Sequence, residues 1–366
     1  MADWSQLPKD LLQLISQRLD SELYLLRFRS VCSTWRSSSS IPKHHPNYLS
    51  LKLPEFYNND PNPPCHISKH NIFLIKPPQH QQTLHHRRPW LIRIGPDPDG
   101  KIQLWHPFSL RPHIPFHFPH HVLDFNQLSV FHLGHLFLLS EANRQIHSAK
   151  LLVAPRQEKQ PLFMVTFNCF GELTLFRCGD ERWTIIQGMA TSAHGDICIF
   201  KGRPCAVDYD GYTVMFEPDL SHHLIAEPLL DEEGVHTKFL LQSECELLLV
   251  DCYACDSGFS IKNGDVRIAV FRLDEKEKKW VKLTSLGDRV LFLGNRYMFS
   301  ASASELGFAK GNCVIYTDDV FKGLDDMEYG MSVFQLDQNR VSPLSDYPDY
   351  LKLFWPPPEW IAELHS

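Results

Sequence analysis

A strand–turn–strand unit recurs from residue 173 onward, and it constrains the fold more than any other feature of the chain. In each copy an apolar stretch is followed by a charged turn and a second short stretch, which Trp183 and Trp280 open in two copies. The copies are residues 173–177 with 183–186, 268–272 with 280–283, and 331–334 with Val341. Short β-prone stretches joined by polar turns are typical of antiparallel hairpins. We therefore expect an almost wholly β structure here.

The spacing of the copies indicates a repeating architecture. Phe176, Phe271 and Phe334 hold the same place in their units and are separated by 95 and 63 residues. The first spacing is about two repeats of the roughly 40–50-residue period of propeller blades, whereas the second does not fit that period. The pattern predicts a degenerate β-propeller, and a large β-sandwich or barrel remains the alternative.

The head of the chain has a different periodicity. Leu7, Leu11, Ile15 and Leu19 recur every four residues, which places them on one face of a helix. A second helix is expected after the cap signal at residues 20–22, and a short third one is expected around Trp35. Three such helices bury only a marginal core on their own. The predicted fold class is therefore α+β multidomain, a small N-terminal three-helix unit followed by an all-β, propeller-like domain.

Charge and cysteine content limit the classes of partner. The net charge is −7; the first 52 residues carry 7 basic and 4 acidic residues, or +3, which leaves −10 for the rest. Such a chain is not held on nucleic acid by bulk charge, and its slightly basic head suggests an acidic partner. No secretory signal is readable, and the apolar runs fall far below the roughly 18 residues of a membrane helix. With reduced thiols as the default, we expect a cytoplasmic and/or nuclear protein with no membrane partner.

Residues 7–36 read LPKDLLQLISQRLDSELYLLRFRSVCSTWR and resemble an F-box. The resemblance implies a three-helix unit that docks on the Skp-type adaptor of a cullin-RING ubiquitin ligase. The apolar residues exceed what so small a unit can bury, and an exposed apolar patch is an interface by default. Packing within the head or on the body is the alternative role for the same residues. The expected adaptor-binding residues are Leu7, Pro8, Leu11, Ile15, Leu19, Leu26, Val31, Cys32 and Trp35.

The body is similar to the C-terminal domain of plant F-box proteins that was long labelled a domain of unknown function and is grouped with β-propellers. The stretches that carry this resemblance are residues 270–274, 280–283, 285–294 and 311–319. The expected organisation is an F-box domain over residues 1–45, a Pro/Asn-rich linker over 46–69 and a propeller-like substrate-recognition domain over 70–366.

Sequence motifs for a metal site or a catalytic site are weak by comparison. Cys252 and Cys255 form a lone CxxC, whereas a structural zinc site needs four ligands. Cys245, His222, His223 and His236 are near in sequence and leave a metal site open as a minor alternative. His194-Gly195-Asp196 is interpreted as a turn, because no GxSxG elbow accompanies it. We therefore expect no catalytic site, no metal and no cofactor.

These observations favour a substrate receptor of an SCF-type (Skp–cullin–F-box) ubiquitin ligase. In this hypothesis the head binds the adaptor and, through it, a cullin-RING ligase, and the body selects a protein substrate whose identity the sequence does not carry. A non-catalytic scaffold that uses its F-box without a cullin or target turnover is the alternative. A metal enzyme built on the Cys and His residues is the third hypothesis.

Overall fold

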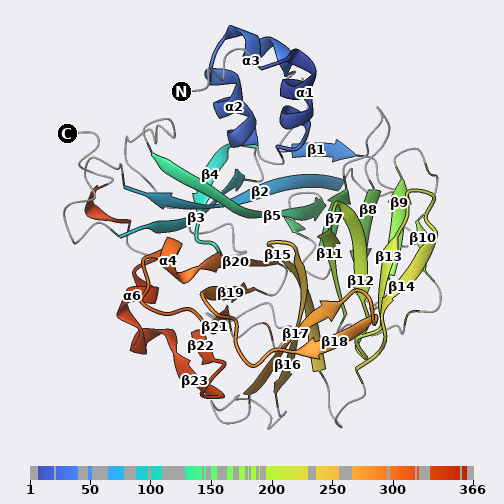
Figure 1. Ribbon diagram of the computed structural model, residues 1–366, viewed down its shortest axis with the longest axis vertical. Coiled ribbons are helices and arrows are strands. Elements are labelled where there is room, and N and C mark those ends of the chain that lie inside the picture. Colours follow the sequence, from blue (N-terminus) through green and yellow to red (C-terminus); the bar gives the residue numbers. More distant parts are fainter. Residues whose placement is uncertain are drawn as a thin grey trace.

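The structure is a computed structural model in which three helices stand beside a ring of β-sheets (Figure 1). It describes residues 7–19, 22–39, 48–51, 65–77, 88–97, 100–108, 128–141, 144–145, 150–154, 163–167, 173–177, 180, 183–186, 189, 195–229, 236–254, 266–294, 297–317, 320, 330–354 and 357–360. Of the helices in this part of the chain, none combines the length and the apolar character that spanning a membrane requires.

The described residues of the head form three short helices, as predicted. They are α1 (Lys9–Gln17), α2 (Glu22–Ser30) and α3 (Ser33–Ser38). Pro8 lies directly before α1, where its missing N–H costs no helical hydrogen bond, and its carbonyl accepts from the Leu12 N–H at 3.0 Å. Leu12 is fully buried, and Phe28 packs on Trp35 with ring centroids 4.6 Å apart. The head therefore has a small core of its own.

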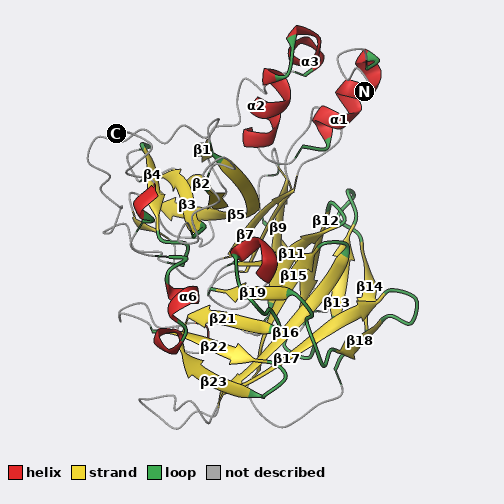
Figure 2. Cartoon of the chain, turned by 60° about the vertical axis from the view of Figure 1, so that its left-hand side comes forward, coloured by secondary structure: helices red, strands yellow, loops and turns green. Residues whose placement is uncertain are grey.

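The described residues of the body form four sheets, labelled here A to D in chain order (Figure 2). Sheet A comprises β1 (Tyr48–Leu51), β2 (Cys65–Lys76), β3 (Trp90–Pro96), β4 (Ile102–Trp105), β5 (Ser129–Glu141), β6 (Arg144–Gln145), β7 (Lys150–Ala154), β8 (Phe163–Phe167), β9 (Leu173–Arg177) and β10 (Thr184–Ile185). Sheet B comprises β11 (Asp196–Phe200), β12 (Arg203–Val207), β13 (Thr213–Phe216) and β14 (His222–Ala226). Sheet C comprises β15 (His236–Ser243), β16 (Glu246–Ala254), β17 (Val266–Asp274) and β18 (Lys279–Lys282).

Sheet D departs from the simple meander of sheets B and C. It comprises β19 (Arg289–Leu293), β20 (Met298–Ser302), β21 (Cys313–Thr317), β22 (Met331–Gln335) and β23 (Arg340–Pro343). β19 pairs antiparallel with β20 but parallel with β21. A parallel pair needs a crossover connection, which β20 and the short helix α4 (Ala303–Leu306) provide. The chain continues through η3 (Leu344–Asp346) and α6 (Pro348–Leu351).

The three hairpins expected from the repeated unit are confirmed as β9–β10, β17–β18 and β22–β23. Their uneven spacing has a structural cause. Between the first two copies lies the whole of sheet B, so 95 residues cover two sheets. Between the last two copies β20 and α4 lengthen the step to sheet D.

Alternating side chains along the strands bury both faces of a sheet. In β19, Val290 and Phe292 point into the core shared with sheet A, whereas Leu291 and Leu293 point into the core shared with sheet C. β16 divides its Leu247–Val250 run in the same way between sheets B and D. Burial on both faces explains why these strands read as continuous apolar runs.

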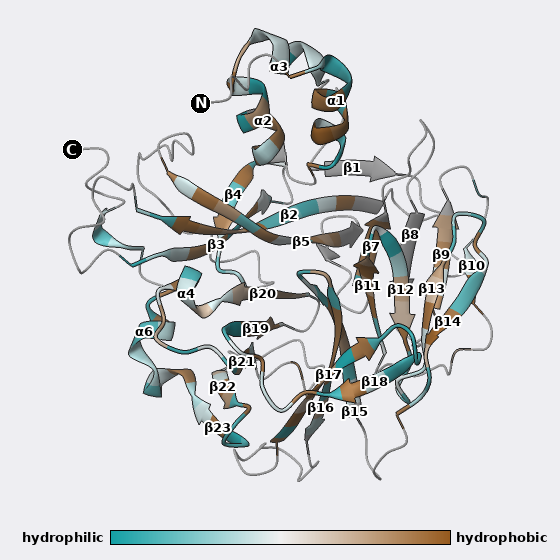
Figure 3. Cartoon of the chain, in the orientation of Figure 1, coloured by the Kyte–Doolittle hydropathy of each residue, from teal (hydrophilic) through white to brown (hydrophobic). Residues whose placement is uncertain are grey.

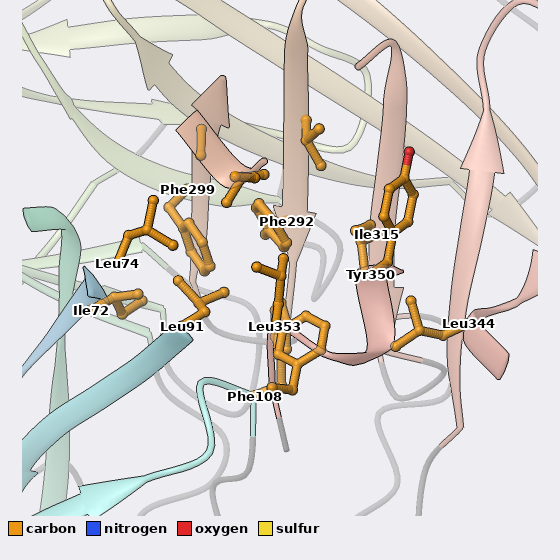
Figure 4. Close-up of a cluster of buried hydrophobic side chains, with 14 of the residues drawn as sticks. Ile72, Leu74, Leu91, Phe108, Phe292, Phe299, Ile315, Leu344, Tyr350 and Leu353 are labelled. Atoms are coloured by element: carbon orange, nitrogen blue, oxygen red, sulfur yellow. The ribbon is translucent and has the colours of Figure 1, made fainter. Parts of the chain in front are cut away.

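The cores link the sheets into a closed ring. Sheet A packs on sheet D around Phe292 and Phe299 (Figure 4), and at its other end it packs on sheet B through Leu173 and Leu175. Sheets B and C share a third core, and sheets C and D share a fourth. The propeller-like prediction is thus confirmed as a four-bladed arrangement, and the sandwich-or-barrel alternative is wrong.

The linker prediction for residues 46–69 is wrong where the structure describes that range. β1 pairs with the first part of β2, from Tyr48 opposite Ser68 to Leu51 opposite Cys65. Residues 66–70 are mostly polar, so the sequence did not indicate that they form the first half of β2. Ile67 in this half is buried, and the strand continues into the apolar run after Asn71. Residues 46–47 and 52–64 lie outside the described part.

Candidate adaptor-binding surface

Three large apolar side chains are exposed among the described residues of the head. Leu11 and Leu14 on α1 are 45% and 53% exposed, and Val31 just after α2 is 55% exposed. Figure 3 shows hydrophobic residues along α1. Since each of these side chains leaves much of its apolar surface in water, together they form a surface suited to a partner.

The other predicted residues are covered to different extents. Pro8 is exposed, whereas Leu7, Ile15, Leu19, Cys32 and Trp35 are half-buried. Trp35 packs on Phe28, so for this residue the alternative role in the head's own core holds in part. The Leu26 side chain lies outside what the structure describes. None of these contacts tests adaptor binding, and the residue set stays a prediction.

Leu14 is the residue that the sequence reasoning missed. Leu14 stands three positions after Leu11, a spacing that places the two on one face of a helix. The sequence offers Leu12 for the apolar face as well. The structure separates the two, because Leu12 is fully buried and Leu14 is exposed. In so short a helix, helix propensity and spacing do not show whether Leu12 or Leu14 is the buried residue.

The motif arginines hold the head together. Arg29 donates from Nη1 to the Arg36 carbonyl at 2.9 Å, and Arg36 donates from Nε to the Arg29 carbonyl at 3.3 Å. Arg29 also donates to the carbonyl of Ser39. These bonds fasten α3 to the end of α2, so the two helices present their surfaces in a fixed relation.

The cysteine and histidine residues of the body do not assemble into a metal site in the described part of the chain. Cys252 is buried in β16, where burial raises the pKa of its thiol well above the ordinary value. Cys245 is exposed, and His222 and His223 are exposed on β14. Cys255 and the His236 side chain lie outside the described residues. Among those described, no group of three His, Cys, Asp or Glu side chains is placed to hold a metal ion.

The turn interpretation of His194-Gly195-Asp196 is wrong for Asp196, and His194 lies outside the described residues. Asp196 is the first residue of β11 and is buried, and burial raises the pKa of its carboxyl group. Its Oδ1 accepts from the Lys150 ammonium of β7, and its Oδ2 accepts from the Leu240 N–H of β15 at 2.7 Å. Gly195 precedes it where an added Cβ would lie 2.4 Å from the Val207 carbonyl oxygen. This carboxylate joins sheets A, B and C, which is a structural role.

A buried basic group lies in sheet A. Arg93 stands over the Trp105 ring, 5.5 Å from its centroid, and burial lowers the pKa of its guanidinium to about 10. Burial and the nearby Arg93 charge lower the pKa of His106 to about 4, and the same two causes lower the pKa of His70 well below its ordinary value. These histidines are therefore neutral at physiological pH.

Two family models match the chain. The one described as F-box domain matches residues 4–46, and the one described as KIB1-4 beta-propeller matches residues 63–335. A three-helix head with exposed apolar residues, joined to a closed ring of sheets, defines an F-box protein with a β-propeller body. The chain belongs to the family of F-box proteins that carry a KIB1-4 β-propeller.

Similar proteins from Arabidopsis thaliana match over the full length. F-box protein SKIP23 is 35% identical, with 99% of this chain and 96% of that protein covered. F-box protein At2g17036 is 32% identical, with 100% and 96% covered. The putative F-box/kelch-repeat protein At5g24040 is 27% identical, with 99% of each covered. The resemblance to plant F-box proteins is thereby confirmed. F-box proteins are in general adaptor subunits rather than enzymes, and an F-box implies binding of a Skp-type adaptor.

Proposed function

We propose that this chain is the substrate receptor of an SCF-type ubiquitin ligase. The observation that carries the proposal is the exposure of Leu11, Leu14 and Val31 on a head that matches the F-box model. These side chains would enter the Skp-type adaptor, together with the half-buried residues of the predicted set. Apolar anchors at the centre of an interface supply most of its binding energy.

The propeller body would hold the target protein. Its strands are fixed by two-sided burial, so the loops at their ends can vary without cost to the core. The chain itself would break and form no bonds. Its contribution would be to raise the effective concentration of the target near a ubiquitin-conjugating enzyme, which tethering achieves without a catalytic residue.

Adaptor binding can be measured with a charge placed in the exposed surface. The double variant Leu14→Asp, Val31→Asp should weaken binding of a purified Skp-type adaptor by about 100-fold or more, because two anchors of about 2 kcal/mol or more each are lost. The control is Ile102→Asp, Val281→Asp, which makes the same change at two exposed apolar positions of the body. Unchanged affinity in a folded head variant would remove the basis of the proposal.

The scaffold alternative and the cellular location need separate experiments. A cullin that co-purifies with the chain and its adaptor would support the ligase, whereas an adaptor complex without a cullin would favour the scaffold. We also propose that the chain works in the cytoplasm and/or the nucleus, where thiols stay reduced. Fluorescence microscopy of a tagged full chain tests this location, and signal confined to another compartment would contradict it.

A further inference from the structure

Helix α2 joins the F-box to the propeller through an arginine of the motif itself. Arg27 donates from Nη1 to the Val130 carbonyl at 3.0 Å and from Nη2 to the Leu128 carbonyl at 2.9 Å. One acceptor lies just before β5 and the other at its second residue, both about one hundred residues away in the sequence. A guanidinium that donates two parallel hydrogen bonds fixes direction as well as distance. α2 and the neighbouring end of β5 lie together in Figures 1 and 2.

Two further side chains of α2, those of Tyr24 and Leu23, also contact sheet A. The Tyr24 hydroxyl oxygen accepts from the His132 N–H at 2.8 Å, and the two rings meet edge to face with centroids 6.3 Å apart. Leu23 packs against the apolar cluster on the outer face of sheet A, to which Leu128 and Val130 also belong. Polar and apolar contacts on successive turns of one helix restrain it against both sliding and rotation.

The restraint extends to the exposed surface. α2 is fastened to α3 by the Phe28–Trp35 packing and the Arg29–Arg36 hydrogen bonds. Val31 follows α2 directly, so its position relative to the propeller depends on how α2 lies on β5, whereas its position within the head does not. A continuous series of packed and hydrogen-bonded groups therefore runs from sheet A to the adaptor-binding surface.

We infer that the contact between α2 and β5 is a fixed joint that sets the orientation of the adaptor relative to the propeller, with Arg27 and Tyr24 as its positioning residues. This inference rests on the proposed function. The joint would hold one side of the body toward the ubiquitin-conjugating enzyme. Lysines there would be modified in preference to lysines elsewhere on the ring.

The joint is first tested by hydrogen exchange of the full chain, read by mass spectrometry. In the double variant Tyr24→Phe, Arg27→Lys, the amides of residues 128–132 should exchange about tenfold faster or more. The His132 N–H loses its acceptor, and this end of β5 opens more often once the guanidinium no longer holds the Leu128 and Val130 carbonyls. The matched control is Arg18→Lys, at an exposed arginine of the same head. Adaptor affinity should stay unchanged in both variants, since neither alters Leu11, Leu14 or Val31.

The positioning role is tested in a reconstituted ligase containing the chain, its adaptor, a cullin-RING module and a ubiquitin-conjugating enzyme. Ubiquitin transferred to the chain itself is mapped on exposed lysines distributed over the ring. These are Lys101 beside sheet A, Lys201 in the β11–β12 turn of sheet B, Lys279 in sheet C and Lys352 after sheet D. The wild type should prefer some of these sites, and the joint variant should lose the preference while its thermal unfolding temperature changes little.

The outcomes separate the two proposals. Unchanged exchange at residues 128–132, or the same lysine preference in wild type and variant, would overturn the inference. If the wild type fails to bind the adaptor, the proposed function falls and the positioning role falls with it. In that case the exchange rates still decide whether α2 is docked on β5.

Discussion

The buried carboxylate of Asp196 shows how much one residue can connect. Lys150, Asp196 and Leu240 belong to three different sheets and meet through this single side chain. Its neighbours in the sequence, a histidine and a glycine, indicate a turn, and no local pattern announces a lysine 46 residues earlier. Such a residue lies beyond sequence reasoning because its role is defined by partners that only the folded ring brings close.

Removing the charge of Asp196 should destabilise the fold. Asp196→Asn keeps an oxygen for the Leu240 N–H but leaves the largely buried Lys150 ammonium without its anion, at a cost of about 3 kcal/mol. Adding Lys150→Met should recover at least about 1 kcal/mol. Glu275→Gln, which breaks the exposed pair with Lys201, should change the free energy of unfolding by less than about 0.5 kcal/mol. Urea unfolding measures all three, and additive effects in the double variant would contradict the pairing.

At the scale of elements, the hairpins could be predicted and their assembly could not. β17–β18 follows from period-two alternation and a charged turn, both local properties of the chain. The joining of β1 to β10 into one sheet and the parallel step from β19 to β21 depend on distant pairing. The F-box helices were likewise predictable, but which of their apolar residues face water depends on how the helices pack on one another and, for Leu23, on sheet A.

Trp280 shows what the tryptophan of the repeated unit contributes. It is buried in β18, and its Nε1 donates to the Gly211 carbonyl of sheet B's turn at 2.9 Å. Trp280→Ala should therefore cost about 3–5 kcal/mol, because a cavity opens between sheets B and C and one hydrogen bond is lost. The neighbouring Val281→Ala, at an exposed position, should stay within about 0.5 kcal/mol of wild type. Thermal unfolding measures both, and equal effects would contradict an inter-sheet role for Trp280.

For the molecule as a whole, stability against acid depends on histidines that the fold holds without charge. The His106 ring contacts Phe354, with centroids 5.4 Å apart, and its Nδ1 accepts from the Phe108 N–H at 3.2 Å, as a neutral ring can. Protonation would place a cation beside Arg93 and remove that acceptor. These histidines therefore bind protons more readily in the unfolded chain than in the folded ring.

Acid should destabilise the ring within a defined range of pH. Because the folded pKa of His106 is about 4 and the ordinary value is 6.5, the unfolded state takes up more protons between these values. The stability is fully present above pH 6.5 and falls as pH drops toward 4, by roughly 1–3 kcal/mol for this residue, with His70 acting in the same direction. His106→Gln should flatten this dependence and the exposed His223→Gln should not. Denaturant unfolding at pH 7 and pH 5 decides between them.

The closure of the ring also governs the order in which the chain can fold. Trp90 donates to the Phe354 carbonyl at 3.0 Å, and the Leu91 N–H donates to the Leu353 carbonyl at 2.8 Å, so the first long strands are completed by the last residues. During synthesis, sheet A leaves the ribosome before sheet D, so the apolar face that later packs on sheet D is still exposed to water. Contacts of such sequence separation form late and slowly. A premature stop near the C-terminus would therefore release a chain whose intact F-box is attached to an aggregating body.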